Sequence, residues 1–85
     1  MSNCKSDYIK ILDAWENNVS HCDIYHMLLN WINTYIENIY DHNAVKDMNL
    51  ILDRIKNDDS MYDIVESFVV GKKYLSLHSI MLEME

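Results

Sequence analysis

Residues 11–25 read ILDAWENNVSHCDIY, and residues 51–65 read ILDRIKNDDSMYDIV. The two stretches align without a gap at a period of 40 residues, with seven of fifteen positions identical. Each contains a Ser-x-x-Asp capping box, at Ser20–Asp23 and Ser60–Asp63, which is typical of a helix start. Each stretch therefore predicts the end of one helix, a tight turn and a new helix. The likeness indicates either a duplicated helical hairpin or the similar residues that any two such turns favour.

Apolar residues spaced three and four apart continue on both sides of these turns, as in amphipathic helices. We expect Ser6 to cap the first helix, Asp41 or Asn43 to cap the third, and Gly71 to end the fourth. The stretch after Tyr74 partly alternates like a strand, but a lone strand would lack a partner, so a helix is predicted. The expected fold is all-α, a small four- or five-helix bundle with helices at about 7–17, 21–40, 44–57, 61–70 and 74–84.

The 85 residues are enough for one domain, predicted over 1–85. Its parts are hairpin 1 at about 7–40, hairpin 2 at about 44–70 and a C-terminal helix at about 74–84. The start of the chain lacks the basic and apolar stretches of a secretory signal, which predicts a cytoplasmic protein with two reduced cysteines. Runs of apolar residues are too short for a membrane span. Abundant Ile, Asn, Lys and Tyr with few Ala indicate an AT-rich gene, as in many viruses and mobile elements.

The residues for common enzyme chemistry are missing from the sequence. A single glycine excludes the glycine-rich phosphate loops, and neither Cys-x-x-Cys nor His-Glu-x-x-His occurs. The nearest metal-like cluster is His21, Cys22, Asp23 and His26, in which side chains three or four apart on a helix can meet. Packing of Cys22, capping by Asp23 and surface exposure of the histidines explain these four residues more simply. The sequence thus predicts no enzyme, no catalytic residue, no cofactor and no metal site.

The negative charge is unevenly distributed along the chain. The formal net charge is −7, and residues 11–45 contain five carboxylates without any Lys or Arg. An acidic surface of this kind attracts a basic protein and repels nucleic acid. A solvated face that keeps the protein soluble is the alternative.

The leading functional hypothesis is a small acidic module that occupies a basic surface on another protein. Inhibitors, immunity proteins, antitoxins and viral or phage proteins that block a host factor all work in this way. Trp31 and Tyr35 are the candidate aromatic anchors, provided that they are exposed. The full set of candidate partner-binding residues is Asp13, Glu16, Asp23, His26, Asn30, Trp31, Tyr35, Glu37 and Asp41.

The alternative hypothesis rests on the apolar width of residues 21–40. Almost all positions outside one narrow polar stripe are apolar there, which is more than one neighbouring helix covers. This helix is therefore expected either to lie at the centre of the bundle or to carry an interface. In the second case, the protein is an assembly or adaptor subunit that forms a homodimer or a hetero-complex through this face.

Overall fold

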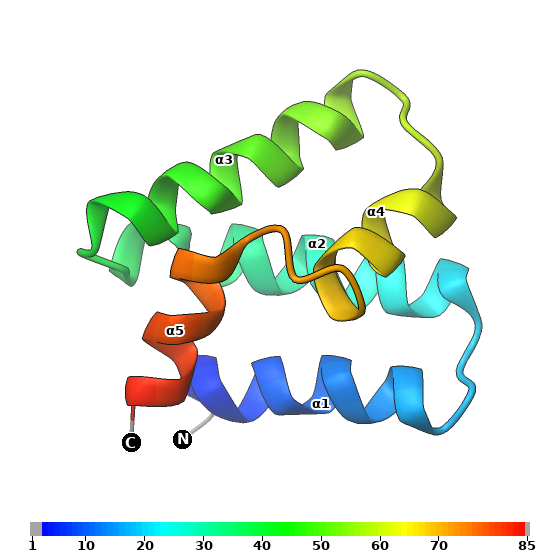
Figure 1. The fold of residues 1–85 in the computed structure, drawn as a ribbon, viewed down its shortest axis with the longest axis horizontal. Helices are drawn as coiled ribbons and strands as arrows, with labels where there is room; N and C mark the ends of the chain where they lie inside the picture. Colours follow the sequence, from blue (N-terminus) through cyan, green and yellow to red (C-terminus); the bar gives the residue numbers. More distant parts are fainter. Residues whose placement is uncertain (1–2, 85) are drawn as a thin grey trace.

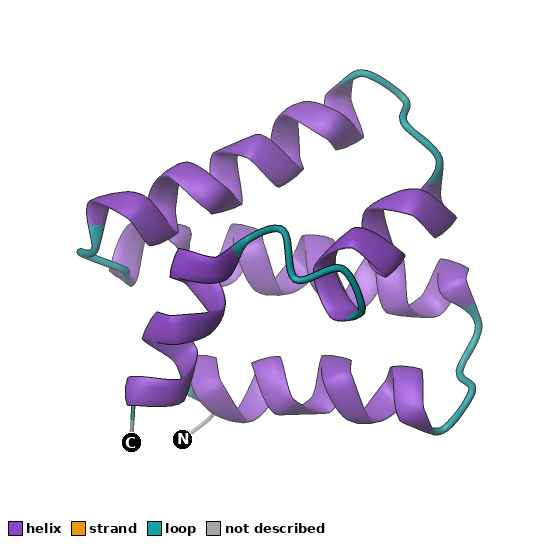
Figure 2. Cartoon of the chain, viewed as in Figure 1, coloured by secondary structure: helices purple, strands orange, loops and turns teal. Residues whose placement is uncertain are grey.

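We describe a computed structural model in which residues 3–84 are placed; residues 1, 2 and 85 of the predicted domain lie outside the described part. The fold is all-α, as predicted, and residues 3–84 contain no strand (Figures 1 and 2). The α-helices are α1 (Cys4–Glu16), α2 (His21–Tyr35), α3 (His42–Lys56), α4 (Met61–Val69) and α5 (Leu75–Glu83), with a short 3-10 helix, η1 (Ile36–Asn38), after α2.

Helix α2 is the centre of the bundle. It packs against both α1 and α4, while α5 packs against α3 and α1 (Figure 1). The expectation that the helix predicted at 21–40 lies at the centre of the bundle is therefore confirmed. Its apolar residues are buried within the chain, among them Ile24, Leu28, Trp31 and Ile32. The two ends of the described chain also meet, where the Lys5 ammonium donates to the carbonyl of Met84 at 2.7 Å.

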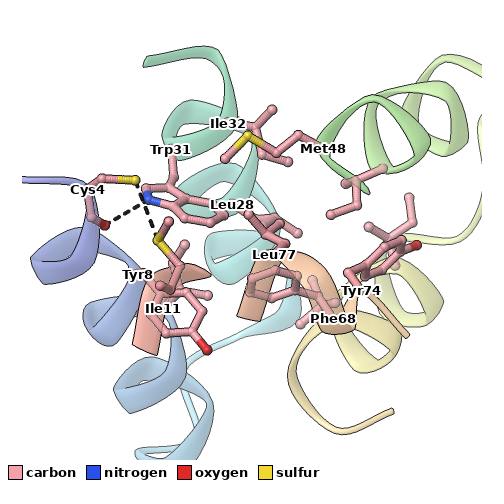
Figure 3. Packing of buried hydrophobic residues seen from close by; sticks show 14 of the residues in the cluster. Cys4, Tyr8, Ile11, Leu28, Trp31, Ile32, Met48, Phe68, Tyr74 and Leu77 are labelled. Carbon is pink, nitrogen blue, oxygen red and sulfur yellow. Dashed lines mark hydrogen bonds between the residues drawn. The ribbon is translucent and has the colours of Figure 1, made fainter. Parts of the chain in front are cut away.

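The core is built around aromatic rings from three helices (Figure 3). Trp31 of α2 lies with its ring centroid 5.8 Å from Tyr8 of α1 and 5.8 Å from Phe68 of α4. The indole Nε1 of Trp31 donates to the carbonyl of Cys4 at 3.0 Å, so its polar atom is satisfied inside the core. Trp31 thus joins α1, α2 and α4 by packing and by a hydrogen bond.

One polar side chain, His78 of α5, is buried beside these rings. Its Nε2 lies 2.8 Å from the carbonyl of Phe68, which can only accept, so Nε2 carries the hydrogen. Its Nδ1 then accepts from the Tyr8 hydroxyl at 2.6 Å. Burial lowers the pKa of His78 and raises the pKa of Tyr8, so both are neutral at pH 7. This relay ties α1, α4 and α5 together without a buried charge.

The two turns of the sequence repeat have the same local structure. Asn18 and Asp58, forty residues apart, both adopt the left-handed conformation, with φ of 60° and 58°. Asn and Asp tolerate this conformation better than other residues with a side chain. In both turns the serine Oγ of the capping box accepts a hydrogen bond from the backbone N–H three residues later. The N–H of Asp23 donates to Ser20 at 3.2 Å, and the N–H of Asp63 donates to Ser60 at 3.4 Å. The predicted helix starts at Ser20 and Ser60 are therefore confirmed.

Replacing Ser20 or Ser60 with Ala is expected to lower the free energy of unfolding by about 1 kcal/mol in each case. The physical reason is that each change leaves one N–H at a helix start without its side-chain acceptor. Thermal or urea unfolding followed by circular dichroism measures the effect. Ser79→Ala is a suitable control because this serine is exposed in α5 and caps no helix. Equal stability of all three variants would contradict the proposed role of the caps.

The first helix begins earlier than predicted. Its N-cap is Asn3, whose side chain accepts from the N–H of Ser6 at 2.7 Å, and Ser6 itself lies inside α1. The expectation that Ser6 is the cap was therefore wrong. The extra turn places Cys4 one turn before Tyr8, so that both are buried on the same face of the helix.

The second helix ends earlier than predicted, at Tyr35 instead of residue 40. The chain tightens into η1 and then extends at Ile39, with φ of −102° and ψ of 124°. This extended residue places Ile39 in the core and leaves Tyr40 93% exposed. It also brings Asp41 to the start of α3, where its carboxylate accepts from the N–H of Ala44 at 2.9 Å. Asp41, one of the two predicted candidates, is thus the cap of α3.

The C-terminal helix is confirmed, and its start is capped from another helix. Tyr74 precedes α5 and provides no side-chain cap. The carboxylate of Asp47 in α3 instead accepts from the N–H of Leu77 at 3.1 Å. Gly71 follows the end of α4 as predicted, but the left-handed residue there is Lys72, with φ of 48°. Gly71 therefore does not end α4 through the positive φ that a glycine at a helix end usually adopts.

Candidate interaction surface

The candidate residues predicted from the sequence do not form one site. Asp13, Glu16 and Asp23 are exposed near the first turn, whereas Glu37 and Asp41 lie beyond the opposite end of α2. These two ends are separated by fifteen helical residues, or about 22 Å. His26 and Asn30 are exposed between them. The polar stripe of α2 is thus a solvent-facing row with carboxylates at its two ends.

Of the two proposed aromatic anchors, Trp31 is buried and Tyr35 is only partly exposed. Trp31 is 2% exposed and belongs to the core. Tyr35 is half-buried, and its hydroxyl donates to the carboxylate of Asp7 at 2.8 Å, which fastens α2 to α1. The condition that these rings are exposed fails for Trp31, so it cannot anchor a partner in this structure. The adaptor hypothesis rested on the apolar face of α2, and this face is likewise buried inside the protein's own core.

The structure brings the two repeated turns together at one end of the molecule (right side of Figure 1). We call this end, residues 13–23 and 53–66, the acidic end. It holds eight carboxylates against two basic side chains, for a net charge of −6 out of the total of −7. One of these bases, Arg54, is engaged locally, because its guanidinium donates to Asp59 at 3.0 Å and to the Tyr74 hydroxyl at 3.2 Å. These bonds raise the pKa of Arg54.

An aromatic cluster lies between the two turns. The ring of His21, at the start of α2, is 4.4 Å from Tyr62, at the start of α4, and 5.3 Å from Trp15, near the end of α1. Tyr62 is exposed, and Trp15 and His21 are half-buried. Val19 and Met61 add exposed apolar side chains at the same two turns. The acidic end therefore combines an apolar centre with a high density of negative charge.

Sequence reasoning missed the contribution of the second turn. Residues 46–85 carry a net charge of only −3, because five Lys and Arg side chains there offset the carboxylates, and this average hides the concentration of negative charge at residues 53–66. The 40-residue repeat is the signal that could have found this turn, because two like hairpins packed side by side bring their turns to one end. Tyr62 was not recognised either, since the contact with His21 joins residues far apart in the chain.

Among the candidate metal ligands near the first turn, His26 and Cys22 contact each other, whereas His21 points to other partners. The Nδ1 of His26 donates to the carbonyl of Cys22 at 2.7 Å and lies 3.7 Å from the Cys22 sulfur. His21 instead contacts Trp15 and Tyr62. Within residues 3–84, no three His, Cys, Asp or Glu side chains gather in a way that could hold a metal ion.

Comparison of the chain with protein-family models, curated proteins and solved structures gives no match. None of the helices within residues 3–84 has both the length and the apolar character needed to cross a membrane. The case for a function therefore depends on the charges and side chains of this chain alone.

Proposed function

We propose that this protein is a small acidic binding module that occupies a basic surface on another protein, in the manner of an inhibitor. The concentration of net charge on the acidic end, around the Trp15–His21–Tyr62 cluster, is the observation that supports the proposal. Closely spaced like charges create a field that steers a basic partner before contact and raises the association rate. The partner's Lys or Arg side chains then meet carboxylates from both turns.

The aromatic cluster provides the short-range part of the same interaction. Affinity in protein interfaces is concentrated in a few aromatic or apolar residues surrounded by polar ones. Tyr62 and His21 present ring surface between the two acidic turns, and a guanidinium or ammonium group can stack on such a face. The carboxylates attract the basic partner and the aromatic rings contact it directly, so both features belong to one surface.

Neutralising two carboxylates at the acidic end is expected to weaken partner binding about tenfold, on the order of 1.4 kcal/mol. The variant is Asp23→Asn with Asp63→Asn, which keeps the size of both exposed side chains. The matched control is Glu37→Gln with Asp41→Asn, at the other end of α2. It removes the same number of charges and preserves the cap of α3, because Asn caps helices as well as Asp does.

The experiment uses the wild-type protein and both variants as immobilised baits in lysate at low salt. Proteins retained by the wild type are purified, and their association rates with the three baits are compared. A slower association with the Asp23/Asp63 variant alone supports the proposal, as does a loss of binding at high salt. Equal weakening by both variants would show that net charge alone matters, and unchanged binding would reject the acidic end as the site.

A further inference from the structure

Helix α5 is short and depends on the rest of the chain for its structure. It has nine residues, and a helix of that length is unstable on its own in water. Its own side chains do not cap its start, where the N–H of Leu77 donates instead to the Asp47 carboxylate of α3 at 3.1 Å. Because α5 is also the last helix, it can detach without separating helices α1 to α4 from one another.

The connection between α4 and α5 is suited to act as a hinge. It contains Gly71 and then Lys72, which adopts the left-handed conformation with φ of 48°. A lysine in this conformation costs free energy, because its Cβ crowds the backbone. The position of α5 in the bundle therefore imposes a strain on Lys72 that detachment of the helix would relieve.

His78 joins α5 to two other helices inside the core. Its Nδ1 accepts from the Tyr8 hydroxyl of α1 at 2.6 Å, and its Nε2 donates to the Phe68 carbonyl of α4 at 2.8 Å. Two charged residues also interact with the ring, Lys72 from the connection and Asp47 from α3. Burial lowers the pKa of His78 and Lys72 lowers it further, which outweighs the opposing effects of the Phe68 carbonyl and Asp47.

Protonation of His78 disrupts this arrangement. The proton adds a hydrogen to Nδ1, so that Nδ1 and the Tyr8 hydroxyl face each other as two donors unless the hydroxyl turns away. It also places a positive charge inside the core, which is costly without a full set of partners, and Lys72 repels that charge. The neutral ring therefore holds α5 in place, and the charged ring favours its release.

The contact between α1 and α5 is open on one side. A groove of about 350 Å³ lies between these helices, and Tyr8 and His78 both line it. Apolar side chains, among them Leu12, line the groove as well, together with the charged Glu16 and Lys72. The two helices are thus not packed together along this side, so that water reaches the His78 ring once α5 begins to move.

We propose that α5 is an acid-released latch, in which protonation of His78 detaches α5 while helices α1 to α4 stay packed. In the detached state His78 is exposed to water and takes up a proton near pH 6.5, as an ordinary histidine does. Proton uptake therefore favours detachment. The detached population should rise as the pH falls below 6.5, by at most about tenfold per pH unit.

The consequence is an apolar surface that becomes exposed in acid. Phe68 is fully buried in the closed bundle, and its ring lies 4.7 Å from the His78 ring, so release of α5 uncovers it. A switch of this kind needs one titrating group and one element with two positions, and His78 and α5 supply them. Helix α5 lies away from the acidic end (Figure 1), so the inference does not depend on the proposed function.

The chain contains a natural reporter of the latch. Cys4 is 6% exposed, and its sulfur lies 3.6 Å from the Met81 sulfur of α5, so detachment of α5 uncovers this thiol. Burial also raises the pKa of the Cys4 thiol, which keeps it unreactive in the closed bundle. Cys22 is exposed and serves as the reference thiol in the same molecule.

The experiment labels the full-length protein with a pyridyl disulfide, which reacts with thiols in mildly acidic as well as neutral solution. Mass spectrometry of peptides gives the labelling rate of Cys4 relative to Cys22 at pH 7.5, 6.5 and 5.5. We expect this ratio to rise by up to about tenfold between pH 7.5 and 5.5 in the wild type. His78→Gln is the matched control, because its amide can make both hydrogen bonds without titrating, and its ratio should stay constant. An equal rise in both proteins would overturn the inference.

Urea distinguishes release of α5 from unfolding of the whole chain. Release of one helix exposes little surface, so Cys4 labelling should depend weakly on urea, whereas global unfolding measured by circular dichroism depends on it steeply. Labelling of Cys4 with the steep dependence of global unfolding would show that α5 does not detach by itself.

Hydrogen exchange of the wild-type protein gives a test that needs no variant and decides the matter if His78→Gln does not fold. At pH 5.5 the amides of α5 should exchange faster than those of α2, after correction for intrinsic rates, and the difference should shrink at pH 7.5. Equal protection of α5 and α2 at pH 5.5 would overturn the inference.

Discussion

Replacing Trp31 with aspartate is expected to unfold the protein. Trp31 is 2% exposed and packs between Tyr8 and Phe68, with its indole N–H bonded to the carbonyl of Cys4. Loss of a buried Trp side chain alone costs about 3–5 kcal/mol, and a buried carboxylate without a partner adds several more. A domain of 85 residues has a total stability of about 4–13 kcal/mol, so this cost is comparable to the whole.

Far-UV circular dichroism at 25 °C measures this outcome directly. The conservative variant Trp31→Phe keeps an aromatic ring and loses the hydrogen bond, so we expect it to remain folded with reduced stability. A folded Trp31→Asp protein with native helicity and a lower mass in light scattering would contradict the buried position. That result would instead place Trp31 in an interface between copies.

Replacing His78 with leucine is expected to lower the free energy of unfolding by about 2–4 kcal/mol at pH 7.5, although leucine is the more apolar residue. The reason is that Tyr8 Oη and the Phe68 carbonyl both lose their partner inside the core. Each buried polar atom left without a hydrogen bond costs about 1–3 kcal/mol. Urea unfolding of the variant and the wild type gives the difference. Unchanged stability would show that water or other groups satisfy these atoms.

The same residue makes the stability of the wild-type protein depend on pH. Burial lowers the pKa of His78, and Lys72 lowers it further, while the Phe68 carbonyl and Asp47 act in the opposite direction. The pKa in the folded protein therefore lies below the value of 6.5 of an exposed histidine. The unfolded chain then binds a proton that the folded protein does not, so His78 stabilises fully above pH 6.5 and progressively less as the pH falls below it.

Unfolding at pH 7.5, 6.5 and 5.5 should show this loss in the wild type, at no more than about 1.4 kcal/mol per pH unit. His78→Gln is the control, because its amide can donate to the Phe68 carbonyl and accept from Tyr8 but does not titrate in this range. The other three histidines, His21, His26 and His42, are the same in both proteins, so the comparison isolates His78. An equal pH dependence of the two proteins would contradict the assignment to His78.

The sequence was informative about the local structure of this protein. Helix starts at Ser20 and Ser60 depend on a serine side chain and a backbone N–H three residues away, and such a contact is readable from spacing alone. Helix boundaries were less predictable where distant residues decide them. The second helix ends at Tyr35 because Ile39 reaches the core, and α5 is capped by Asp47 from a helix thirty residues earlier.

The candidate surface was predictable in its charge and less so in its position. An acidic first hairpin follows from the absence of Lys and Arg between residues 11 and 45, and the exposed positions of Asp13, Glu16 and Asp23 agree with it. Burial of Trp31 was not predictable, because an apolar helix looks the same whether it is covered by its own chain or by another. Tyr62 escaped notice because its contact with His21 is made only when α2 and α4 pack together.

The all-α class, the positions of both turns and the overall negative charge could be read from the residues alone, because these features depend on neighbouring residues and on composition. The central position of α2, the shared end of both acidic turns and the exposure of Leu75 and Leu82 depend on how the helices pack. The physical reason is that apolar spacing specifies which face of a helix is buried, but not which neighbour buries it. That choice depends on how helices α1 to α5 pack together, with Trp31 and Phe68 filling the space between them.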